Sequence, residues 1–288
     1  MKTFATAVRA EPTAPRPCAL CGAERFGPLW RLEGFSFVRC GSCGLIQQNP
    51  QPAREAVLAR YGSEYLEYET ERQFEYRDLE LLALEDLGFE EAAAGLVVRA
   101  RDEGRAVRFL DVGCATGALL EHFRSRGWDC QGIEVSAEEA AWGRKHWGLD
   151  ILSTTLEDAG LVAASREVVH ASHLVEHLND PRSFLAECRR VLAPEGLLVL
   201  ATPNADGFQA RILRARWRSA IYDHLYLFSR RTLSALLADC GFDILRSITW
   251  GGWAAGLRPA FLKRPLDRAA KRFGFGDVMA YIARRRPD

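Results

Sequence analysis

Short apolar runs alternate with amphipathic segments along the chain from residue 107 onward. The apolar runs predict strands, and the segments with apolar residues at helical spacing predict helices. Such alternation is typical of a doubly wound, mainly parallel α/β sheet. The predicted strands are 107–112, 129–134, a short one near 151, 168–172, 197–201, 242–250 and 278–283, and the predicted helices are 118–126, 137–146, 181–192 and 231–240.

The first hundred residues follow a different pattern. Residues 51–104 carry apolar side chains at helical spacing amid many acidic residues, which predicts a helical cap or linker with a turn near Gly62. We interpret the acidic excess as a solvated face. Residues 1–17 are rich in Ala, Pro and Thr without periodicity, which favours a flexible arm. The predicted organisation is a small ribbon with its arm at 1–50, the helical segment at 51–104, and a core at 105–288 with an insertion at about 251–276.

Composition adds a few constraints. The 288 residues suffice for one large domain with a small appendage, and 38 basic residues balance 38 acidic ones. A neutral chain gives no global reason to expect nucleic acid or a membrane surface as partner. There is no apolar run long enough to predict a membrane span and no recognisable secretory signal, so we expect a cytoplasmic protein. Thiols stay reduced there, and paired cysteines then favour a metal site over disulfides.

Two cysteine pairs lie in the predicted ribbon, Cys18-x-x-Cys21 and Cys40-x-x-Cys43, with eighteen residues between them. This spacing is that of a four-cysteine zinc ribbon. A glycine directly follows each pair, as tight turns around a metal prefer. Four thiolates leave no open coordination position, so the expected Zn²⁺ is structural and not catalytic. The alternative is four unrelated reduced cysteines.

A loop suited to a nucleotide-type cofactor follows the first core strand. Asp111, Gly113, Ala115 and Gly117 occupy the turn between that strand and the next helix. The glycines allow close backbone approach, and the start of the helix offers unpaired amides. The leading acid suits a cofactor with a cationic ammonium group and repels a pyrophosphate, which favours S-adenosylmethionine over NAD. A plain strand–helix turn is the alternative.

Further cofactor contacts are expected where the neighbouring strands end. Glu134 ends the second strand, where a carboxylate can accept hydrogen bonds from both ribose hydroxyls. Leu156 and Glu157, in the loop before the next long strand, are placed to line the adenine, although an ordinary polar loop would look the same. His173 follows that strand at the carboxyl edge of the sheet, where cofactor and substrate meet.

Two further histidines are candidates for proton transfer. Methyl transfer needs in-line alignment of acceptor and methyl, and an acceptor that is a hydroxyl or an acidic carbon also needs a base. His177 lies four residues after His173, which one helical turn would place on the same face, and His224 follows the fifth strand at the same sheet edge. Alternatively both are structural, one capping a helix and the other bonded to Asp223. His170, inside a predicted strand, is expected to be a packed core residue.

These residues together make the chain resemble the class I S-adenosylmethionine-dependent methyltransferases, in particular a bacterial branch with an N-terminal zinc segment found beside sugar and secondary-metabolite pathways. The resemblance implies a Rossmann-like, seven-stranded sheet whose final strand is antiparallel. It also implies acid–base roles for His177 and His224, the positions matching histidines proposed for them in related sugar C-methyltransferases. Ala115 departs from the glycine that many members carry. The motifs that carry the resemblance are the two cysteine pairs, 61–65, 111–117, Glu134, 173–181, 194–196, 202–204 and 223–225.

The predicted function is therefore methyl transfer from S-adenosylmethionine to a small molecule, a sugar, nucleotide-sugar or natural product, by O- or C-methylation. An RNA base methyltransferase is an alternative, although the modest charge of the ribbon argues against nucleic acid as partner. A non-catalytic cofactor-binding scaffold that binds a partner through the ribbon is another. The basic segment within 251–276 leaves contact with a membrane surface open. Nothing in the sequence indicates the oligomeric state.

Overall fold

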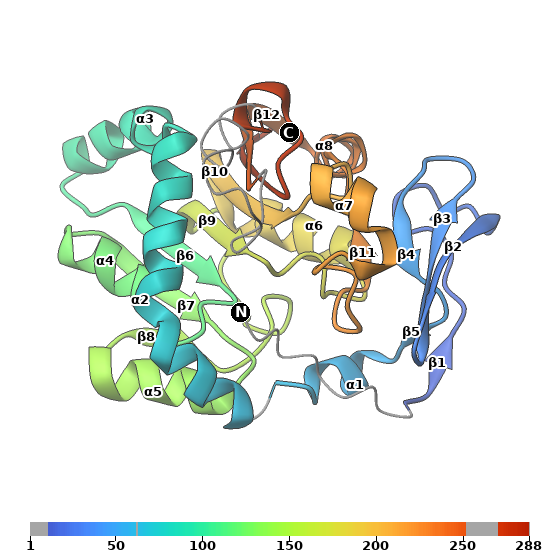
Figure 1. Ribbon diagram of the computed structural model, residues 1–288. Helices are drawn as coiled ribbons and strands as arrows, with labels where there is room; N and C mark the ends of the chain where they lie inside the picture. Colours follow the sequence, from blue (N-terminus) through green and yellow to red (C-terminus); the bar gives the residue numbers. More distant parts are fainter. Residues whose placement is uncertain (1–10, 62, 252–269, 288) are drawn as a thin grey trace, which may run out of the picture.

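The computed structural model describes residues 11–61, 63–251 and 270–287, and its central layer is a seven-stranded sheet (Figure 1). The strand order is β12-β13-β10-β9-β6-β7-β8, with β13 antiparallel to both of its neighbours and the other pairs parallel. The predicted doubly wound sheet with an antiparallel final strand is thus confirmed. Its strands are β6 Arg108–Val112, β7 Asp129–Ile133, β8 Asp150–Leu152, β9 Arg166–Ser172, β10 Leu192–Pro203, β12 Phe242–Trp250 and β13 Val278–Arg285.

Two apolar cores form because side chains alternate across the pleated strands. In β10, Leu198 and Leu200 join the core that contains α6 and α8, whereas Leu197 and Val199 join the core that contains α3, α4 and α5. Both faces of the sheet are therefore covered, as the continuous apolar runs in its central strands require. The covering helices are α3 Phe89–Asp102, α4 Ala118–Ser125, α5 Ala137–Trp147, α6 Pro181–Val191 and α8 Arg230–Asp239.

Local sequence signals mark the starts of these helices, close to the predicted positions. The Asp180 side chain accepts hydrogen bonds from two amides of the first turn of α6, and Pro181 occupies the first helical position. Ser229 and Thr232 form a reciprocal capping box at the start of α8, and Gly241 follows that helix with φ 83°. Two shorter helices, α7 Phe208–Leu213 and η1 Arg214–Arg216, follow β10.

The helical segment before the core consists of α1 Arg54–Leu58, α2 Ser63–Asp86 and α3. The interruption between α1 and α2 agrees with the turn predicted near Gly62. A second break, at Gly88, was not predicted; Gly88 has φ 65°, and an added Cβ would lie 1.9 Å from the guanidinium of Arg246. The long helix α2 packs against α3, α4 and α5 on the side of the sheet away from the ribbon (Figure 1).

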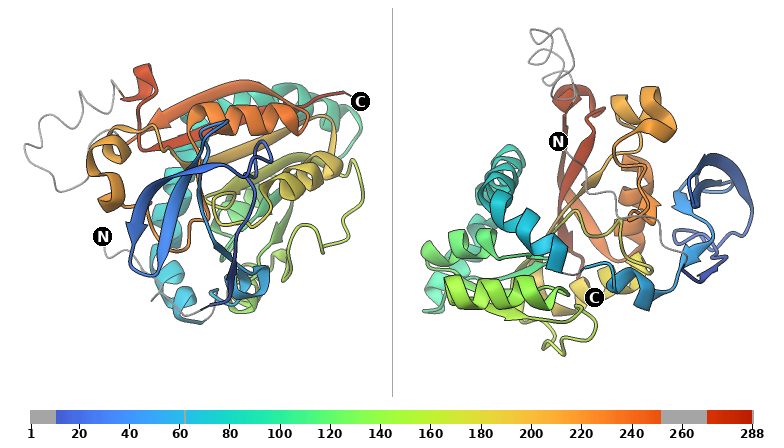
Figure 2. Two further views of the ribbon diagram at one scale, coloured as in Figure 1. Left: turned by 90° about the vertical axis from the view of Figure 1, so that its right-hand side faces the viewer. Right: turned by 60° about the horizontal axis from the view of Figure 1, so that its bottom comes forward.

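The ribbon lies at the opposite side of the molecule from α2–α5 (Figure 2). It contains β2 Phe26–Leu32, β3 Phe35–Cys40 and β4 Ile46–Gln48, and β11 Tyr226–Leu227 from the core completes its sheet in the order β11-β4-β3-β2. The predicted arm is not loose throughout, because β1 Thr13–Ala14 pairs antiparallel with β5 Gln51–Pro52. Ribbon and core are thus joined by strand pairing that the sequence did not predict.

The predicted insertion at 251–276 falls mainly on residues 252–269, which lie outside the described residues. The proposed membrane-surface contact through this segment lies there as well. In the part of the chain that the structure describes, no helix has the length and apolarity needed to cross a membrane.

Candidate active site and zinc centre

The predicted cofactor loop connects β6 to α4 and is held close to the end of β7. The amides of Gly113 and Cys114 both donate to the carbonyl of Ile133, at 2.8 and 3.2 Å. Gly117 has φ 83°, and an added Cβ would lie 2.5 Å from Leu149 Cδ1, so only glycine fits this position. Ala115 also has a positive φ, 48°, a conformation that glycine adopts more readily. The loop thus has the close-packed, glycine-containing form expected where a cofactor approaches the backbone.

Asp111 lies at the end of β6 and is 4% exposed. Its Oδ1 is 2.7 Å from Nδ1 of His170, the histidine that was correctly predicted to be a core residue. Burial pulls the pKa of His170 down, but the charge and hydrogen bond of Asp111, with Glu80, raise it above its ordinary value. The acid predicted to face a cationic cofactor is therefore partly engaged by an internal histidine.

Glu134, at the end of β7, fixes the shape of this edge of the sheet. Its Oε2 accepts from the Ala115 amide at 3.0 Å, and its Oε1 accepts from the Ser136 amide at 2.8 Å. Burial raises the pKa of Glu134, and the amide hydrogen bonds oppose this effect. Each carboxylate oxygen can accept a second hydrogen bond, so the arrangement leaves capacity for ribose hydroxyls.

The sequence reasoning missed three partly or fully buried carboxyl groups, two of them near Glu134 and the third near Asp111. Burial, followed by repulsion from Glu134 and other acids, raises the pKa of Glu69 to about 7 and that of Glu139 to about 9. Burial also raises the pKa of Glu80 to about 7. A cation bound among these groups would favour their ionised forms. The acidic excess of residues 51–104 was visible in the sequence, but it is not fully solvated, because the side chains of Glu69 and Glu80 on α2 are only partly exposed.

The other predicted cofactor residues differ in exposure. Leu156 is 1% exposed and belongs to the core cluster shared with α6, whereas Glu157 is exposed. His173 directly follows β9 with φ 51°, and its side chain is half exposed. Residues 173–177 form a turn and not a helix, so the expected stacking of His173 and His177 on one helical face is wrong.

A cluster of two histidines and one carboxylate lies beyond β9 and β10. The rings of His177 and His224 are 4.7 Å apart, centroid to centroid, although the residues are far apart in sequence. Glu176, 1% exposed, accepts a hydrogen bond from Thr202 Oγ1 through Oε2 at 2.9 Å. Nδ1 of His177 lies 3.0 Å from the carbonyl of Asp223. The structure therefore brings together the two predicted catalytic histidines and adds Glu176, which was not singled out.

Burial and mutual repulsion determine the charges in this cluster. Burial, followed by the charge of His177, lowers the pKa of His224 to about 3. Burial also lowers the pKa of His177. Burial opposes ionisation of Glu176, but hydrogen bonding and charge from His173, followed by the charges of His177 and His224, lower its pKa to about 2. The cluster thus combines an ionised carboxylate with two neutral imidazoles, which carry lone pairs at neutral pH.

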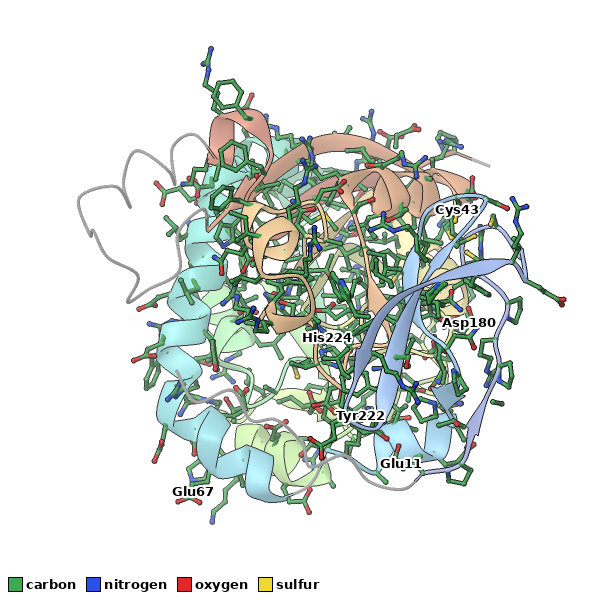
Figure 3. All side chains as sticks on the ribbon, turned by 45° about the vertical axis from the view of Figure 1, so that its right-hand side comes forward. Glu11, Cys43, Glu67, Asp180, Tyr222 and His224 are labelled. Carbon is green, nitrogen blue, oxygen red and sulfur yellow. The ribbon has the colours of Figure 1, made fainter. Side chains whose placement is uncertain are left out.

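The ribbon holds the loop that carries His224. The side-chain amide of Gln48, 1% exposed in β4, donates to the carbonyls of Tyr222 and His224 at 2.7 and 2.8 Å. The backbone amide of Gln48 donates to Leu225 at 2.8 Å. Tyr222 also donates to Glu11, and both are labelled with His224 in Figure 3. The N-terminal segment therefore contributes directly to the geometry of the candidate active site.

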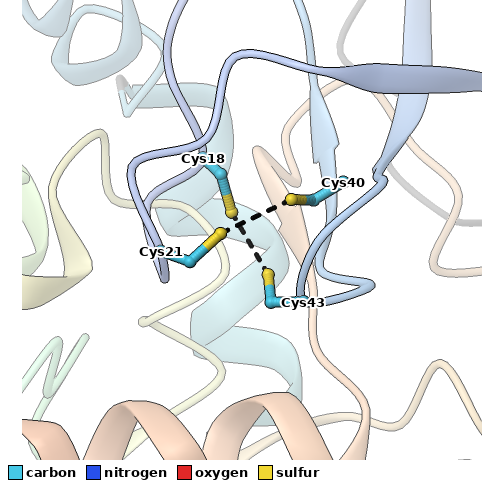
Figure 4. Close-up of side chains that lie close together, drawn as sticks. All are labelled: Cys18, Cys21, Cys40 and Cys43. Atoms are coloured by element: carbon cyan, nitrogen blue, oxygen red, sulfur yellow. Dashed lines mark hydrogen bonds between the residues drawn. The ribbon is translucent and has the colours of Figure 1, made fainter.

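The four predicted metal-ligating cysteines converge at one point (Figure 4). Their sulfur atoms all lie within 4.8 Å of one another, with Cys18–Cys43 at 3.4 Å and Cys21–Cys40 at 3.6 Å. All four are free thiols. Tetrahedral zinc with Zn–S bonds of about 2.3 Å requires sulfur–sulfur distances of about 3.8 Å, so the donor set fits Zn²⁺. Four sulfur ligands would fill the coordination sphere, and Figure 3 shows Cys43 well apart from His224.

Comparison with known families identifies the family of the protein. The family model described as "Methyltransferase domain" matches residues 65–247, more than half of the chain. The chain belongs to the methyltransferase family. The matched region of this methyltransferase contains the cofactor loop, Glu134 and the histidine cluster, whereas the cysteine ribbon lies outside it.

Curated relatives match part of this methyltransferase. The ubiquinone biosynthesis O-methyltransferase of Cereibacter sphaeroides is 32% identical over 120 residues, which are 39% of this chain and 49% of that protein. The protein of the same description from Bradyrhizobium sp. is 35% identical over 105 residues, which are 35% of this chain and 41% of that protein. The chain thus spans about half the length, or less, of these relatives.

Solved structures share the fold at low sequence identity. A methyltransferase from Haloferax volcanii, solved with the Trm112 activator, has a TM-score of 0.50 and 19% identity over 74% of this chain and 98% of that chain. A methyltransferase from Thermotoga maritima has a TM-score of 0.49 and 20% identity over 62% of this chain and 82% of that chain. The similarity to the Haloferax structure supports the Rossmann-like methyltransferase fold alone.

Proposed function

We propose that this methyltransferase transfers the methyl group of S-adenosylmethionine to an oxygen atom of a small molecule, such as a sugar, nucleotide-sugar or natural product. The observation that carries the proposal is the pair of neutral histidines, His177 and His224, at the carboxyl edge of a methyltransferase sheet. The two curated relatives described above, both named as O-methyltransferases, support oxygen as the acceptor atom. A carbon acceptor that loses a proton would need the same base.

We assign cofactor binding to the sheet edge described above. The glycines at 113 and 117 allow close approach of the methionine part, and Glu134 suits the ribose hydroxyls. The buried acids near Glu134 favour a cationic sulfonium and ammonium. The assigned residues are Asp111, Gly113, Ala115, Gly117, Glu134, Leu156, Glu157 and His173. We further propose that residues 1–50, 51–104 and 105–288 act as ribbon, helical cap and catalytic core.

In the proposed reaction the acceptor oxygen attacks the methyl carbon while the carbon–sulfur bond breaks. Holding the two atoms in line supplies part of an orientation effect whose upper range is about 7–11 kcal/mol. The acceptor proton passes to the free ring nitrogen of His177 or His224. Glu176, ionised and in the same cluster, would stabilise the imidazolium that forms.

The test replaces each histidine with glutamine and measures turnover together with cofactor affinity. We expect His177→Gln and His224→Gln to lower kcat by about 10²–10⁴-fold, because positioned acid–base groups contribute roughly that much. The dissociation constant of S-adenosylmethionine, from titration calorimetry, should change little. His146→Gln, an exposed histidine on α5, is the matched control. Unchanged turnover on acceptors that the wild type methylates would contradict the proposal.

A further inference from the structure

We propose that Glu176, His177 and His224 form a binding site for a divalent first-row transition-metal ion, separate from the four-cysteine zinc centre. One ligand atom from each of the three side chains lies within 4.8 Å of the other two. Two imidazoles and one carboxylate are a ligand set typical of Zn²⁺, Co²⁺, Mn²⁺ or Fe²⁺. Three protein ligands, unlike four cysteines, leave coordination positions open for a substrate.

The hydrogen bonds of both histidines orient them as metal ligands. Nδ1 of His177 is 3.0 Å from the carbonyl of Asp223, and Nδ1 of His224 is 2.8 Å from the carbonyl of Ser219. A carbonyl only accepts, so each Nδ1 carries the proton and each Nε2 carries a lone pair. An imidazole that donates through one nitrogen to a backbone carbonyl and binds through the other is the usual arrangement in metal sites.

The carboxylate has an oxygen available for the same ion. Glu176 is 1% exposed; Thr202 donates to its Oε2, and Nδ1 of the half-exposed His173 lies 3.3 Å from its Oε1. A carboxylate oxygen can accept at two sites, so Oε1 keeps a lone pair that can bind a cation.

Hydrogen bonds among the turn after β9, the loop with His224 and the ribbon hold the cluster in place. The carbonyl of Glu176 accepts from the amides of Leu225 and Tyr226, at 2.7 and 3.1 Å, which joins the turn after β9 to the loop with His224. Gln48 of the ribbon holds that loop from the other side. The ligands are thus positioned without needing the ion, which is the preorganisation that a binding site requires.

The open positions indicate the class of acceptor. An ion held by three protein ligands can bind two adjacent oxygens of one molecule, so we infer an acceptor with vicinal oxygens, as in a catechol or an α-hydroxyketone. With the ion bound, both Nε2 atoms are ligands and no longer act as the base proposed above; instead the ion lowers the pKa of the bound hydroxyl, whose proton passes to water. The oxygen–carbon bond then forms as the carbon–sulfur bond breaks, which leaves neutral S-adenosylhomocysteine. This step rests on the proposed methyl transfer, whereas metal binding does not.

The test measures metal content before activity. Co²⁺ is titrated into the full chain carrying its zinc, and bound metals are counted by plasma mass spectrometry. We expect one Co²⁺ per chain beyond the zinc, with the weak visible absorption of nitrogen and oxygen ligands and no thiolate charge-transfer band. Glu176→Gln, His177→Gln and His224→Gln should each abolish the extra Co²⁺, whereas His146→Gln retains it. Zinc content and S-adenosylmethionine affinity serve as folding controls.

Further outcomes separate this inference from the proposed function. 3,4-Dihydroxybenzoate should shift the Co²⁺ spectrum of the wild type, and no shift would overturn the vicinal-oxygen acceptor. Absence of extra Co²⁺ at millimolar concentration, or equal binding by all three variants, would overturn the site. Full turnover by protein freed of the extra metal would overturn its role and leave methyl transfer intact. Metal binding without methylation of any acceptor would support the site and count against the proposed function.

Discussion

Ala115 and His173 hold backbone conformations that residues other than glycine rarely adopt, with φ of 48° and 51°. The left-handed region costs such a residue about 1–2 kcal/mol. Both lie at the carboxyl edge of the sheet, where strained residues concentrate in functional sites. Ala115 is held there by its amide, which donates to the buried Glu134. The folding of the rest of the core compensates this local cost.

The strain at Ala115 predicts that replacing it with glycine does not have the usual destabilising effect. Ala115→Gly should leave stability unchanged or raise it by up to about 1 kcal/mol, because relief of the left-handed strain offsets the greater entropy of unfolded glycine. Ala94→Gly, the same change on an exposed position of α3, should cost about 1 kcal/mol. Urea midpoints of the two variants provide the comparison. Equal destabilisation would show that Ala115 is not strained.

Glu139 predicts a pH dependence of stability. Burial, with repulsion from Glu134 and Glu69, raises its pKa in the folded protein to about 9, above the ordinary value of 4.5. The unfolded state therefore releases this proton first, and stability is lost as the pH rises from about 4.5 to about 9, by at most about 1.4 kcal/mol per pH unit. Glu139→Gln does not titrate and removes this loss.

The measurement is urea unfolding of both proteins, free of cofactor, at pH 5 and pH 8. Glu139→Gln should be more stable than the wild type at pH 8, with a smaller difference at pH 5. Glu138→Gln, the same change at the neighbouring exposed position, should show no such divergence. A Glu139→Gln advantage of the same size at both pH values would show that the carboxyl group ionises normally.

At the scale of elements, β4 of the ribbon positions the loop that carries His224. Gln48→Leu removes the donor to Tyr222 and His224; the carbonyl of Tyr222 keeps Arg60 as a donor, whereas that of His224 loses the Gln48 bond. We expect a fall in turnover of at least tenfold with little change in S-adenosylmethionine affinity, because the cofactor loop is on β6. Gln47→Leu, at the preceding buried position, affects only carbonyls and amides of the arm and ribbon. It should lower stability and spare turnover; equal losses of turnover in both variants would contradict this role for Gln48.

Periodicity was sufficient to predict the main elements, because long apolar strands and amphipathic helices each bury many residues in register. The prediction for β10, 197–201, was too short: β10 spans Leu192–Pro203 because it pairs with β9 and β13 on its two sides. The pairs β1–β5 and β4–β11 were missed, since β1, β5 and β11 have two residues each and a two-residue strand has no period. Their pairing depends on contacts between distant segments.

The candidate site was only partly visible in the sequence for a similar reason. Parallel strands end at one edge, so placing His177 and His224 near one another needed only the strand order and the family resemblance. Glu176 was not singled out, because its burial depends on how the turn after β9 folds against Thr202 and the loop from 219 to 227. The neighbouring carbonyl of Asp223, and not its side chain, accepts from His177. Such contacts depend on the tertiary structure and are not visible in the local sequence.

At the scale of the whole molecule, the ribbon is part of the core and not an independent appendage. Cys18, Cys40 and Leu45 belong to the same apolar cluster as residues of α6 and α8. Arg182 of α6 donates to the carbonyl of Ala19 at 2.8 Å, and Arg231 of α8 donates to that of Cys43. A ribbon of this size buries too little apolar surface to fold alone, so docking onto the core stabilises it, and we propose that a structural Zn²⁺ held by the four cysteines does so as well.

This coupling predicts that loss of the proposed structural Zn²⁺ disables the distant histidine cluster. Cys40→Ser should remove one Zn²⁺ per chain, because a tetrahedral site lacking one thiolate binds weakly. The freed ribbon would release β4, its partner β11 and the Gln48 contacts, so the loop with His224 would lose its support. The cofactor loop, on the other side of the sheet edge, keeps its contacts with β7. Turnover should therefore fall much further than S-adenosylmethionine affinity.

Cys240→Ser, at a cysteine outside the cluster, should retain both zinc and turnover. If Cys40→Ser lost cofactor affinity and turnover in equal measure, the zinc would be stabilising the entire fold, and if it lost neither, the ribbon would fold without its metal.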